Sequence, residues 1–145
     1  MKYYFDTNSD GYLSKKERNN ATLISAKYWK ISSFKGIKYF PNLKYLDCGH
    51  NNLTSLDFSG NKKLEKLNCD YNKLTALSTG NTPKLRTLYC GNNSLKTLNV
   101  SKSRSLQKLF CKPNKLTKLD VRKNKKLTAK GGIIDADKGV KIIKK

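Results

Sequence analysis

The chain has 145 residues, enough for one elongated domain, and its 31 Lys and Arg against 10 Asp and Glu give a formal net charge of +21. No apolar run approaches the roughly 18 residues of a membrane-spanning helix, so the sequence predicts no transmembrane segment. The start, MKYYFDTNSD, lacks the apolar region of a signal peptide, so the protein is either cytoplasmic or a mature or excised piece of something longer.

The N-terminal residues 1–20 contain a twelve-residue pattern, Asp6 to Glu17, with the spacing of a calcium loop. Gly11 permits the sharp turn at the sixth position. The predicted oxygen donors are Asp6, Asn8, Asp10, Tyr12 through its backbone carbonyl, Ser14 and Glu17. The pattern resembles EF-hand loops, including those of dockerins, and the resemblance implies a bound Ca²⁺ that holds the N-terminal edge. A cation-free polar turn is the alternative, because few residues precede Asp6 and no second loop is present to pair with it.

The segment 21–42 is interpreted as a degenerate first copy of a repeat that becomes regular at Leu43. If this copy is one position longer than the regular ones, its apolar positions are Ala21, Ile24, Ala26, Ile31 and Phe34. Terminal repeats are expected to be atypical because they cap an open core. Tyr28 and Trp29 are therefore interpreted as packing within this cap.

Residues 43–126 contain four copies of a 21-residue repeat, the first of which reads LKYLDCGHNNLTSLDFSGNKK. Each copy carries one cysteine and, three positions later, one asparagine. These are Cys48, Cys69, Cys90 and Cys111, and Asn51, Asn72, Asn93 and Asn114. Such fixed spacing indicates a stacked solenoid rather than a conventional globular core.

The spacing within one copy predicts how its side chains point. Leu46 and Cys48 are two positions apart, so in a strand they lie on the same side. Strands of successive copies would stack about 4.8 Å apart, which places identical side chains in columns. The amide of Asn51 is expected to bond the backbone where the chain turns out of the strand. Cysteines separated by a whole repeat are expected to be buried and apolar rather than zinc ligands or disulfide partners.

The pattern L-x-x-L-x-C-x-x-N-x-L-x-x-L resembles leucine-rich repeats, specifically the short bacterial repeats of internalin-like proteins, with cysteine at a usual leucine position. The resemblance implies a solenoid with a parallel β-sheet on its concave face. Such a short repeat leaves little room for α-helix, so extended chain, turns and 3₁₀-helix are expected on the convex side. The resemblance also implies an extracellular or cell-surface protein, although the chain itself carries no anchor or signal, and a cytoplasmic location stays open.

Two departures from the pattern carry predictions. In the second copy Thr79 replaces Phe58 and Asn81 comes one place early, which predicts a local rearrangement and weaker packing. Beyond Leu127 the expected leucine is Lys130, so residues 127–145 are interpreted either as a C-terminal cap or as the frayed end of a longer array. In the first case Ile133–Ile134 and 140–143 would form a hairpin around Gly139 that covers the last edge.

The outward strand positions would line the concave face, which is the usual binding surface of such solenoids. The candidate partner-binding residues are Tyr45, Asp47, Lys66, Asn68, Asp70, Thr87, Tyr89, Lys108, Phe110 and Lys112. Because aromatic residues are favoured at interfaces, this set predicts a protein partner. The single histidine, His50, is interpreted as a solvated rim residue.

No recognisable catalytic constellation accompanies these residues, so the chain is predicted not to be an enzyme. Three functions follow: protein binding through the concave face, a calcium-stabilised spacer, and charge-led binding to an anionic polymer or surface. The excess positive charge lies in turns and on the return leg, where it is either a solvated coat or an attraction for polyanions. No nucleic-acid-binding motif is present, which argues against specific nucleic-acid recognition.

Overall fold

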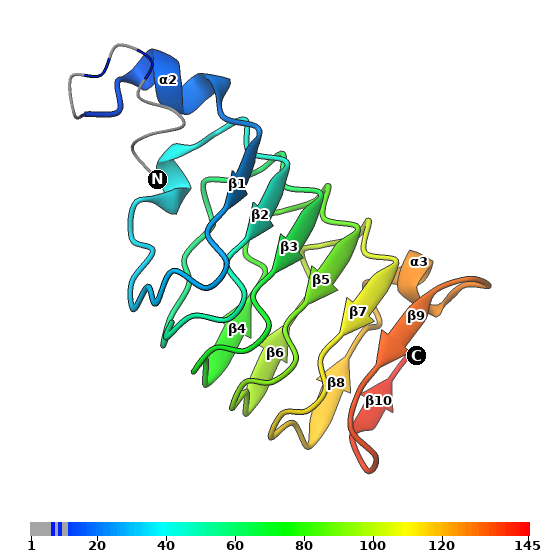
Figure 1. The fold of residues 1–145 in the computed structure, drawn as a ribbon. Coiled ribbons are helices and arrows are strands. Elements are labelled where there is room, and N and C mark those ends of the chain that lie inside the picture. Colours follow the sequence, from blue (N-terminus) through cyan, green and yellow to red (C-terminus); the bar gives the residue numbers. More distant parts are fainter. Residues whose placement is uncertain (1–6, 8, 10–11) are drawn as a thin grey trace.

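The structure, a computed structural model, describes residues 7, 9 and 12–145. The chain winds into a flattened solenoid whose successive coils lie side by side (Figure 1). Each coil contributes one short strand to a parallel sheet of six. These strands are β1 (Leu23–Ser25), β2 (Tyr45–Asp47), β3 (Lys66–Asn68), β5 (Thr87–Tyr89), β7 (Lys108–Phe110) and β9 (Ile133–Asp135). The predicted parallel-strand solenoid is confirmed.

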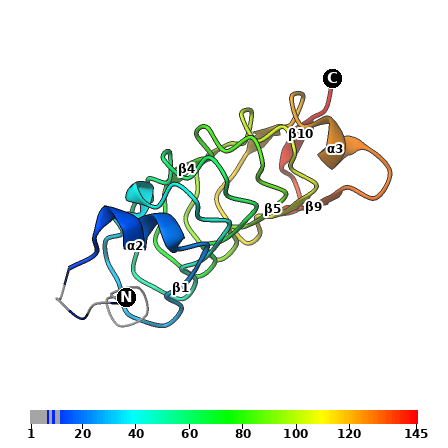
Figure 2. The same cartoon turned by 90° about the horizontal axis from the view of Figure 1, so that it is seen from above.

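The opposite face of the solenoid carries the return legs, which are extended chain (Figure 2). Four short strands form there, namely β4 (Ala76–Ser78), β6 (Thr97–Asn99), β8 (Lys118–Asp120) and β10 (Lys141–Ile143). They pair in parallel as β4 with β6 and β8 with β10. Within the described residues, helix is limited to α2 (Lys15–Asn20), the 3₁₀ turn η1 (Ile37–Tyr39) and α3 (Lys125–Thr128).

The strand register follows the sequence repeat. Leu46 pairs with Leu67, Leu67 with Leu88, and Leu88 with Leu109. The core between the two faces is therefore built of columns of like side chains. Its most deeply buried columns are Leu43, Leu64, Leu85, Leu106 and Leu127, and Cys48, Cys69, Cys90 and Cys111. Burying one leucine side chain contributes about 1.5–3 kcal/mol, so each coil is stabilised mainly by its contact with the next.

The column of asparagines closes the turn after each strand. Asn72 Nδ2 donates to the carbonyls of Cys48 in the preceding coil and Cys69 in its own, at 3.0 and 3.1 Å. Its Oδ1 accepts from the N–H of Leu53 at 2.9 Å. Asn51, Asn93 and Asn114 repeat this arrangement. One side chain thus satisfies backbone groups of two coils that the turn would otherwise leave unpaired.

A second polar column, which the repeat pattern did not predict, lies on the return side. Asn61 Nδ2 donates to the carbonyls of Ile37 and Phe40, both at 2.9 Å. Asn124 Nδ2 donates in the same way to Val100 at 2.9 Å and Ser103 at 2.8 Å. Between them the column continues as Thr82 and Ser103, whose hydroxyls lie 3.0 Å apart. This column explains why the second coil keeps its place in the stack.

The predicted rearrangement of the second coil is absent, because the register of the repeat runs through it without a break. Ala76 pairs with Thr97, and Thr79 donates its N–H to the carbonyl of Asn99 at 2.9 Å. Both Thr79 and Thr82 are fully buried. The Thr82 hydroxyl donates to the carbonyl of Thr79 at 2.7 Å, so the smaller side chains hold the turn by a local hydrogen bond.

Both ends of the array are coils of the same solenoid. At the N-terminal end Ile24 pairs with Leu46, which is the register predicted for the slightly longer first copy. At the C-terminal end Ile134 pairs with Leu109, so this coil is longer than the regular repeat. The extra residues lie between Leu127 of the leucine column and Ile133, directly after α3, and the pattern therefore resumes at Ile134 rather than failing at Lys130.

The C-terminal hairpin prediction is wrong. The two tail strands do not pair with each other: β9 pairs in parallel with β7, and β10 pairs in parallel with β8 (Figure 1). Because each strand extends a different face of the solenoid, residues 133–143 form a sixth coil. The apolar residues Ile134, Ala136, Val140 and Ile142 of this coil are only partly buried against the core.

Candidate binding surface

The outward side chains of the six-stranded sheet form the surface called here the sheet face. Its central strands bring aromatic rings together. The rings of Tyr89 and Phe110 stack with centroids 4.7 Å apart and planes 5° apart. The ammonium of Lys66 lies 5.5 Å from the centre of the Tyr89 ring, within cation–π range, and Tyr45 is 43 % exposed. Predicted residues from four strands therefore share one surface.

A hollow of about 500 Å³ lies on the N-terminal half of the sheet face. The hollow collects Tyr45, Asp47, Lys66, Asn68, Asp70 and Tyr89 from the predicted set. It also includes Leu23 and Ser25 of the degenerate first coil, which were not predicted to bind a partner. Their omission followed from treating residues 21–42 only as a cap, although the alternation that places Ile24 inward also places Leu23 and Ser25 outward.

Two carboxylates give the hollow an acidic character. Asp47 Oδ1 accepts from the N–H of Gly49 at 3.0 Å, and Asp70 Oδ1 accepts from the N–H of Gly91 at 2.6 Å. Burial raises the pKa of the half-buried Asp70 above its ordinary value. Among the residues that the structure describes, neither carboxylate is in an ion pair. The hollow thus combines acidic oxygens with phenol rings.

The C-terminal half of the sheet face is arranged differently. Lys112 Nζ forms an ion pair with Asp135 Oδ1 at 2.6 Å, and this carboxylate raises the pKa of Lys112. Lys108 is exposed, while Thr87 is half-buried and lies between the two halves. The predicted partner-binding residues are therefore on one face but in two groups, one acidic and aromatic and one basic.

Three rings at the turn after the strands were not predicted as part of a surface. The ring of His50 stacks on Tyr71 with centroids 4.1 Å apart, and the Tyr28 ring lies 4.4 Å from it on the other side. All three residues have positive φ, between 53° and 64°, which is uncommon for side chains of this size. Tyr28 and Trp29, which were interpreted as packing within the cap, are 62 % and 45 % exposed, and the Tyr28 ring packs on His50 of the next coil. The signal was present in the sequence, because each ring falls two positions after a cysteine or its equivalent, Ala26.

The predicted calcium segment is only partly described. Asp6, Asn8 and Asp10 lie outside the described residues, and Tyr12 is exposed. Ser14 caps α2 by accepting from the N–H of Glu17 at 3.2 Å, and Glu17 Oε2 accepts from the N–H of Ser14 at 2.8 Å. Glu17 Oε1 accepts from both the N–H and the hydroxyl of Thr7, at 2.6 and 2.9 Å. The bonds from Ser14 and Thr7 lower the pKa of Glu17 to about 2, so its carboxylate is ionised at neutral pH.

The four cysteines are free and buried in the core column. Cys48 Sγ donates to the carbonyl of Asn68, and Cys69 Sγ donates to that of Tyr89, both at 3.3 Å. Burial raises the pKa of Cys48 and Cys111 to about 12 and that of Cys69 and Cys90 well above its ordinary value. These thiols stay protonated at neutral pH and therefore make poor nucleophiles and poor metal ligands.

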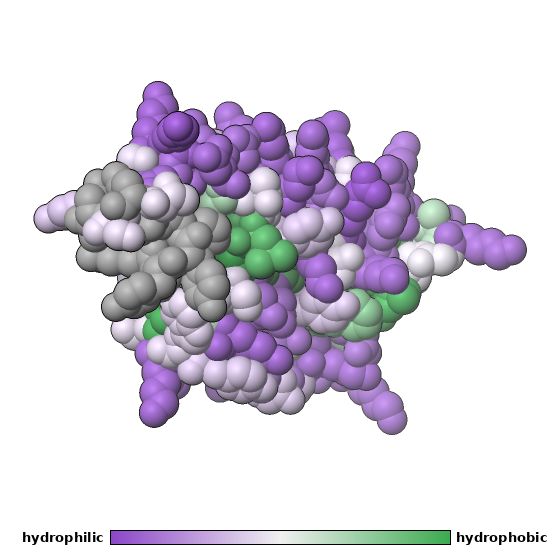
Figure 3. Space-filling model, turned by 45° about the horizontal axis from the view of Figure 1, so that its top comes forward, coloured by the Kyte–Doolittle hydropathy of each residue, from purple (hydrophilic) through white to green (hydrophobic). Residues whose placement is uncertain are grey.

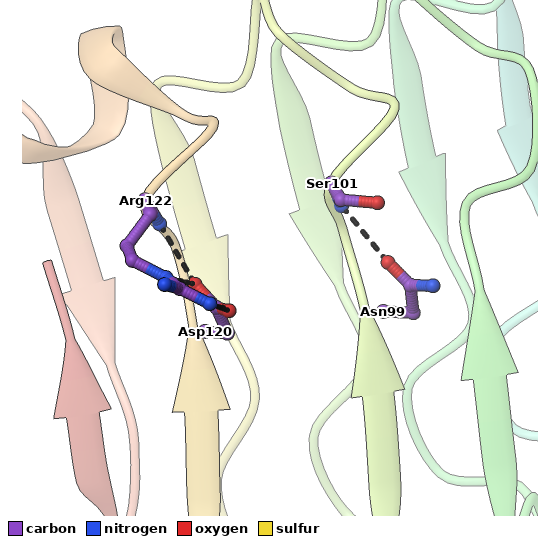
Figure 4. A network of polar contacts seen from close by, with 4 residues as sticks. All are labelled: Asn99, Ser101, Asp120 and Arg122. Carbon is purple, nitrogen blue, oxygen red and sulfur yellow. Dashed lines mark hydrogen bonds and ion pairs between the residues drawn. The ribbon is translucent and has the colours of Figure 1, made fainter. Parts of the chain in front are cut away.

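The return face holds a second hollow, whose lining includes Asn99, Ser101, Asp120 and Arg122. These four residues already bond to one another in pairs (Figure 4). Arg122 donates to both carboxylate oxygens of Asp120 at 2.7–3.1 Å, and its backbone N–H also donates to Asp120 Oδ1 at 3.0 Å. One coil earlier the N–H of Ser101 donates to Asn99 Oδ1 at 3.0 Å. These side chains close turns at the end of each return strand, which is a common local role for Asp and Asn.

Neither a metal site nor a membrane segment competes with the sheet face in the part of the chain that the structure describes. Within residues 7, 9 and 12–145, no group of three or more His, Cys, Asp or Glu side chains is placed to hold a metal ion. The same residues contain no helix long and apolar enough to cross a membrane.

Comparisons with known proteins agree with this geometry. Residues 41–81 match a family model described as leucine-rich repeats in two copies, and residues 112–133 match a model described as a leucine-rich repeat. No curated protein sequence matches the chain. Among solved structures, the functional domain of InlJ from Listeria monocytogenes, which includes a cysteine ladder, aligns with a TM-score of 0.63 at 28 % identity. The alignment covers 90 % of this chain and 32 % of that one. The chain thus contains leucine-rich repeats and has a leucine-rich repeat solenoid fold similar to that of InlJ.

Proposed function

We propose that the chain is a non-catalytic module that binds a protein partner through its sheet face. The observation that carries the proposal is the hollow of about 500 Å³, lined by phenol rings and two carboxylates that no lysine of the described residues pairs with. Aromatic rings beside a concave surface are the side chains that most often anchor interfaces.

A comparison of two triple variants tests this proposal. The first changes Tyr45, Tyr89 and Phe110 to Ser on the sheet face, and the matched control changes Tyr12, Trp29 and Tyr39 to Ser, which are exposed elsewhere. Proteins captured by the immobilised wild-type chain are identified by mass spectrometry and then titrated individually as purified proteins. The sheet-face variant is expected to lose at least tenfold in affinity, while the control retains it. Unchanged affinity in the sheet-face variant would reject this face as the binding site.

The setting in which this binding takes place is also a proposal. The similarity to InlJ supports an extracellular or cell-surface location, where an internalin-like solenoid would meet proteins of other cells. Because the chain spans only 32 % of the InlJ chain it matches, the activity of that whole protein is not transferred to it. Immunolabelling of intact and permeabilised cells that express the full reading frame tests the location: signal only after permeabilisation would contradict it.

Calcium binding at residues 6–17 is the second candidate, as a structural rather than a signalling function. Two observations support it: Glu17 is ionised at neutral pH, and its carboxylate folds back onto Thr7 within the loop. Glu17 Oε1 already accepts two hydrogen bonds, so a bidentate contact to Ca²⁺ requires the loop at Thr7 to shift. Ser14 and Glu17 would hold the ion from the start of α2, together with Asp6, Asn8, Asp10 and the Tyr12 carbonyl.

Isothermal titration with CaCl₂ tests the calcium proposal directly. The wild-type chain is expected to take up one ion, and chelation is expected to lower the melting temperature while the repeats stay folded at room temperature. Asp10→Ala is expected to abolish uptake, and Asp57→Ala, a carboxylate on the return leg, serves as the control. Absence of uptake by the wild-type chain, with no change in melting on chelation, would reject the proposal.

A further inference from the structure

One side of the six-stranded sheet carries more positive charge than the other. The leading edge is defined here as the turns that run into the strands, residues 62–65, 83–86, 104–107 and 125–128. It contains seven basic residues and one acidic residue, Glu65. The seven are Lys62, Lys63, Lys84, Arg86, Arg104, Lys125 and Lys126. The equivalent turns that leave the strands, residues 49–52, 70–73, 91–94 and 112–115, contain three basic residues, one of which, Lys112, is paired with Asp135.

Basic residues that served only solubility would not need to be more frequent on one edge of the sheet. The seven basic residues of the leading edge are all exposed. Within the residues that the structure describes, the ion pairs join Lys38 to Asp57, Lys112 to Asp135 and Arg122 to Asp120, so none of the seven takes part. Figure 3, which brings the top of the molecule forward, shows hydrophilic residues crowding this side. The leading edge is therefore a one-sided cationic surface without internal neutralisation.

The repeat arranges these cations in rows. The strand register gives Lys63 and Lys84 equivalent places in their coils. Lys126 occupies the same place, because its neighbours Asn124 and Leu127 keep their positions in the polar and leucine columns. Lys62, Arg104 and Lys125 form a second row beside them. Coils are about 4.8 Å apart, so the rows extend for roughly 15 Å from the coil of Lys62 to that of Lys125. A small anion would meet only one or two of these side chains, whereas a linear polyanion laid across the coils would meet most of them.

We propose that the leading edge binds a linear phosphate-bearing polymer without bases, laid across the coils. Binding would be sequence-independent and driven by counterion release, because exposed lysines and arginines offer charge rather than a shaped pocket. The turns of the leading edge contain no aromatic residue, so they offer no ring on which a nucleobase could stack. This site is separate from the sheet face and does not depend on a protein partner there.

Fluorescence anisotropy with labelled linear inorganic polyphosphate tests the site. The edge variant carries Lys63→Gln, Lys84→Gln, Arg104→Gln and Lys126→Gln. The control variant removes the same four charges at exposed positions outside the edge, as Lys115→Gln, Lys118→Gln, Lys138→Gln and Lys141→Gln. The edge variant is expected to lose at least tenfold more affinity than the control, and its salt dependence, the slope of log K against log salt, is expected to fall by about 3. Circular dichroism checks that both variants stay folded, as expected for exposed substitutions.

Three results would overturn the proposal. Equal losses in the two variants would show that net charge, not the edge, attracts the polymer. Binding that weakens little with salt would contradict the electrostatic mechanism. Single-stranded DNA with the same number of phosphates that binds at least tenfold more tightly than polyphosphate would assign the edge to nucleic acid instead. The sheet-face variant at Tyr45, Tyr89 and Phe110 is expected to bind polyphosphate as the wild type does, so this proposal and the protein-binding proposal fail separately.

Discussion

Both polar columns of the solenoid hydrogen-bond backbone groups at turns, but the residue type is constant in one column and varies in the other. The column after the sheet strands uses asparagine in all four regular coils, whereas the column on the return side runs Asn61, Thr82, Ser103, Asn124. The side chain after a strand reaches carbonyls of two successive coils and also accepts an N–H, as Asn93 does with Cys69, Cys90 and Leu74. Only an amide has both the donors and the acceptor for this, so the position tolerates no shorter side chain.

The side chains of the return column satisfy fewer backbone groups than those of the column after the strands. In Asn61 and Asn124 the Nδ2 groups are bonded, but their Oδ1 atoms are buried without a hydrogen-bond partner among the described residues. A hydroxyl that donates locally, as Thr82 does to Thr79, leaves no such oxygen. Thr82 and Ser103 are as buried as Asn61 and Asn124, so burial does not determine which positions of the repeat vary. The comparison teaches that a position varies less when its side chain bonds more backbone groups.

The largest effect on stability is expected in the column after the strands, where every regular coil has asparagine. Asn93→Ala leaves the N–H of Leu74 without its acceptor and removes one of the two amide donors from each carbonyl of Cys69 and Cys90. The combined loss is expected to cost about 3 kcal/mol of unfolding free energy. Urea unfolding followed by circular dichroism measures it, with Ser94→Ala on the neighbouring surface as a control that should change stability little. A cost below that of Thr82→Val would remove the distinction between the columns.

Substitutions in the return column are expected to destabilise the fold less. Thr82→Val keeps the shape but loses the bonds to the Thr79 carbonyl and the Ser103 hydroxyl, for an expected cost of about 1–2 kcal/mol. Thr82→Ser retains the hydroxyl and is the matched control. If Val and Ser at position 82 destabilise equally in the same urea experiment, packing rather than hydrogen bonding holds this column.

Alkaline pH separates the two columns further, because only the strand side contains buried thiols. The pKa of Cys48 is raised in the folded chain from 9.0 to about 12, so its stabilising contribution is present below pH 9 and is lost as the pH rises from 9 toward 12. Each pH unit in that window weakens folding by up to about 1.4 kcal/mol per thiol. Cys48→Ala is expected to show a correspondingly smaller loss between pH 8 and 10 in urea unfolding. A pH dependence identical to that of the wild type would contradict this.

The smallest effect is expected at the exposed turns of the return leg. The pKa of Asp120 is lowered to about 2 by the side chain of Arg122, so its contribution is present above the ordinary value of 3.8 and is lost as the pH falls through about 2. Arg122→Ala is expected to move the pKa of Asp120 back toward its ordinary value in a carboxyl NMR titration, with little change in stability because both groups are exposed. An unmoved pKa would assign the shift to the backbone N–H alone.

The repeat itself predicted most of this fold. Its fixed period determined which side chains form columns, and a first copy one position longer placed Ile24 beside Leu46 from the sequence alone. The sheet-face residues followed from alternation within each strand. Whether Asp6, Asn8 and Asp10 bind calcium stays a prediction, because these residues are outside the described part of the chain.

The failures have physical reasons. The break after Leu127 was interpreted as the end of the pattern because a fixed period cannot anticipate the residues inserted between α3 and β9. The hairpin followed from that error, since two apolar runs around Gly139 fit either an antiparallel pair or the two faces of one more coil. The stack of Tyr28, His50 and Tyr71 was missed because these residue types differ, although they share one backbone position.

The additional length at α3 has a practical consequence. It enlarges one turn of the leading edge, yet Ile134 still pairs with Leu109 and the following return strand still finds its neighbour. A turn that absorbs extra length without disturbing the strands on either side is a natural place to graft a reporter peptide or an epitope. Such a graft after Leu127 would travel with the solenoid while leaving the hollow of the opposite half unobstructed.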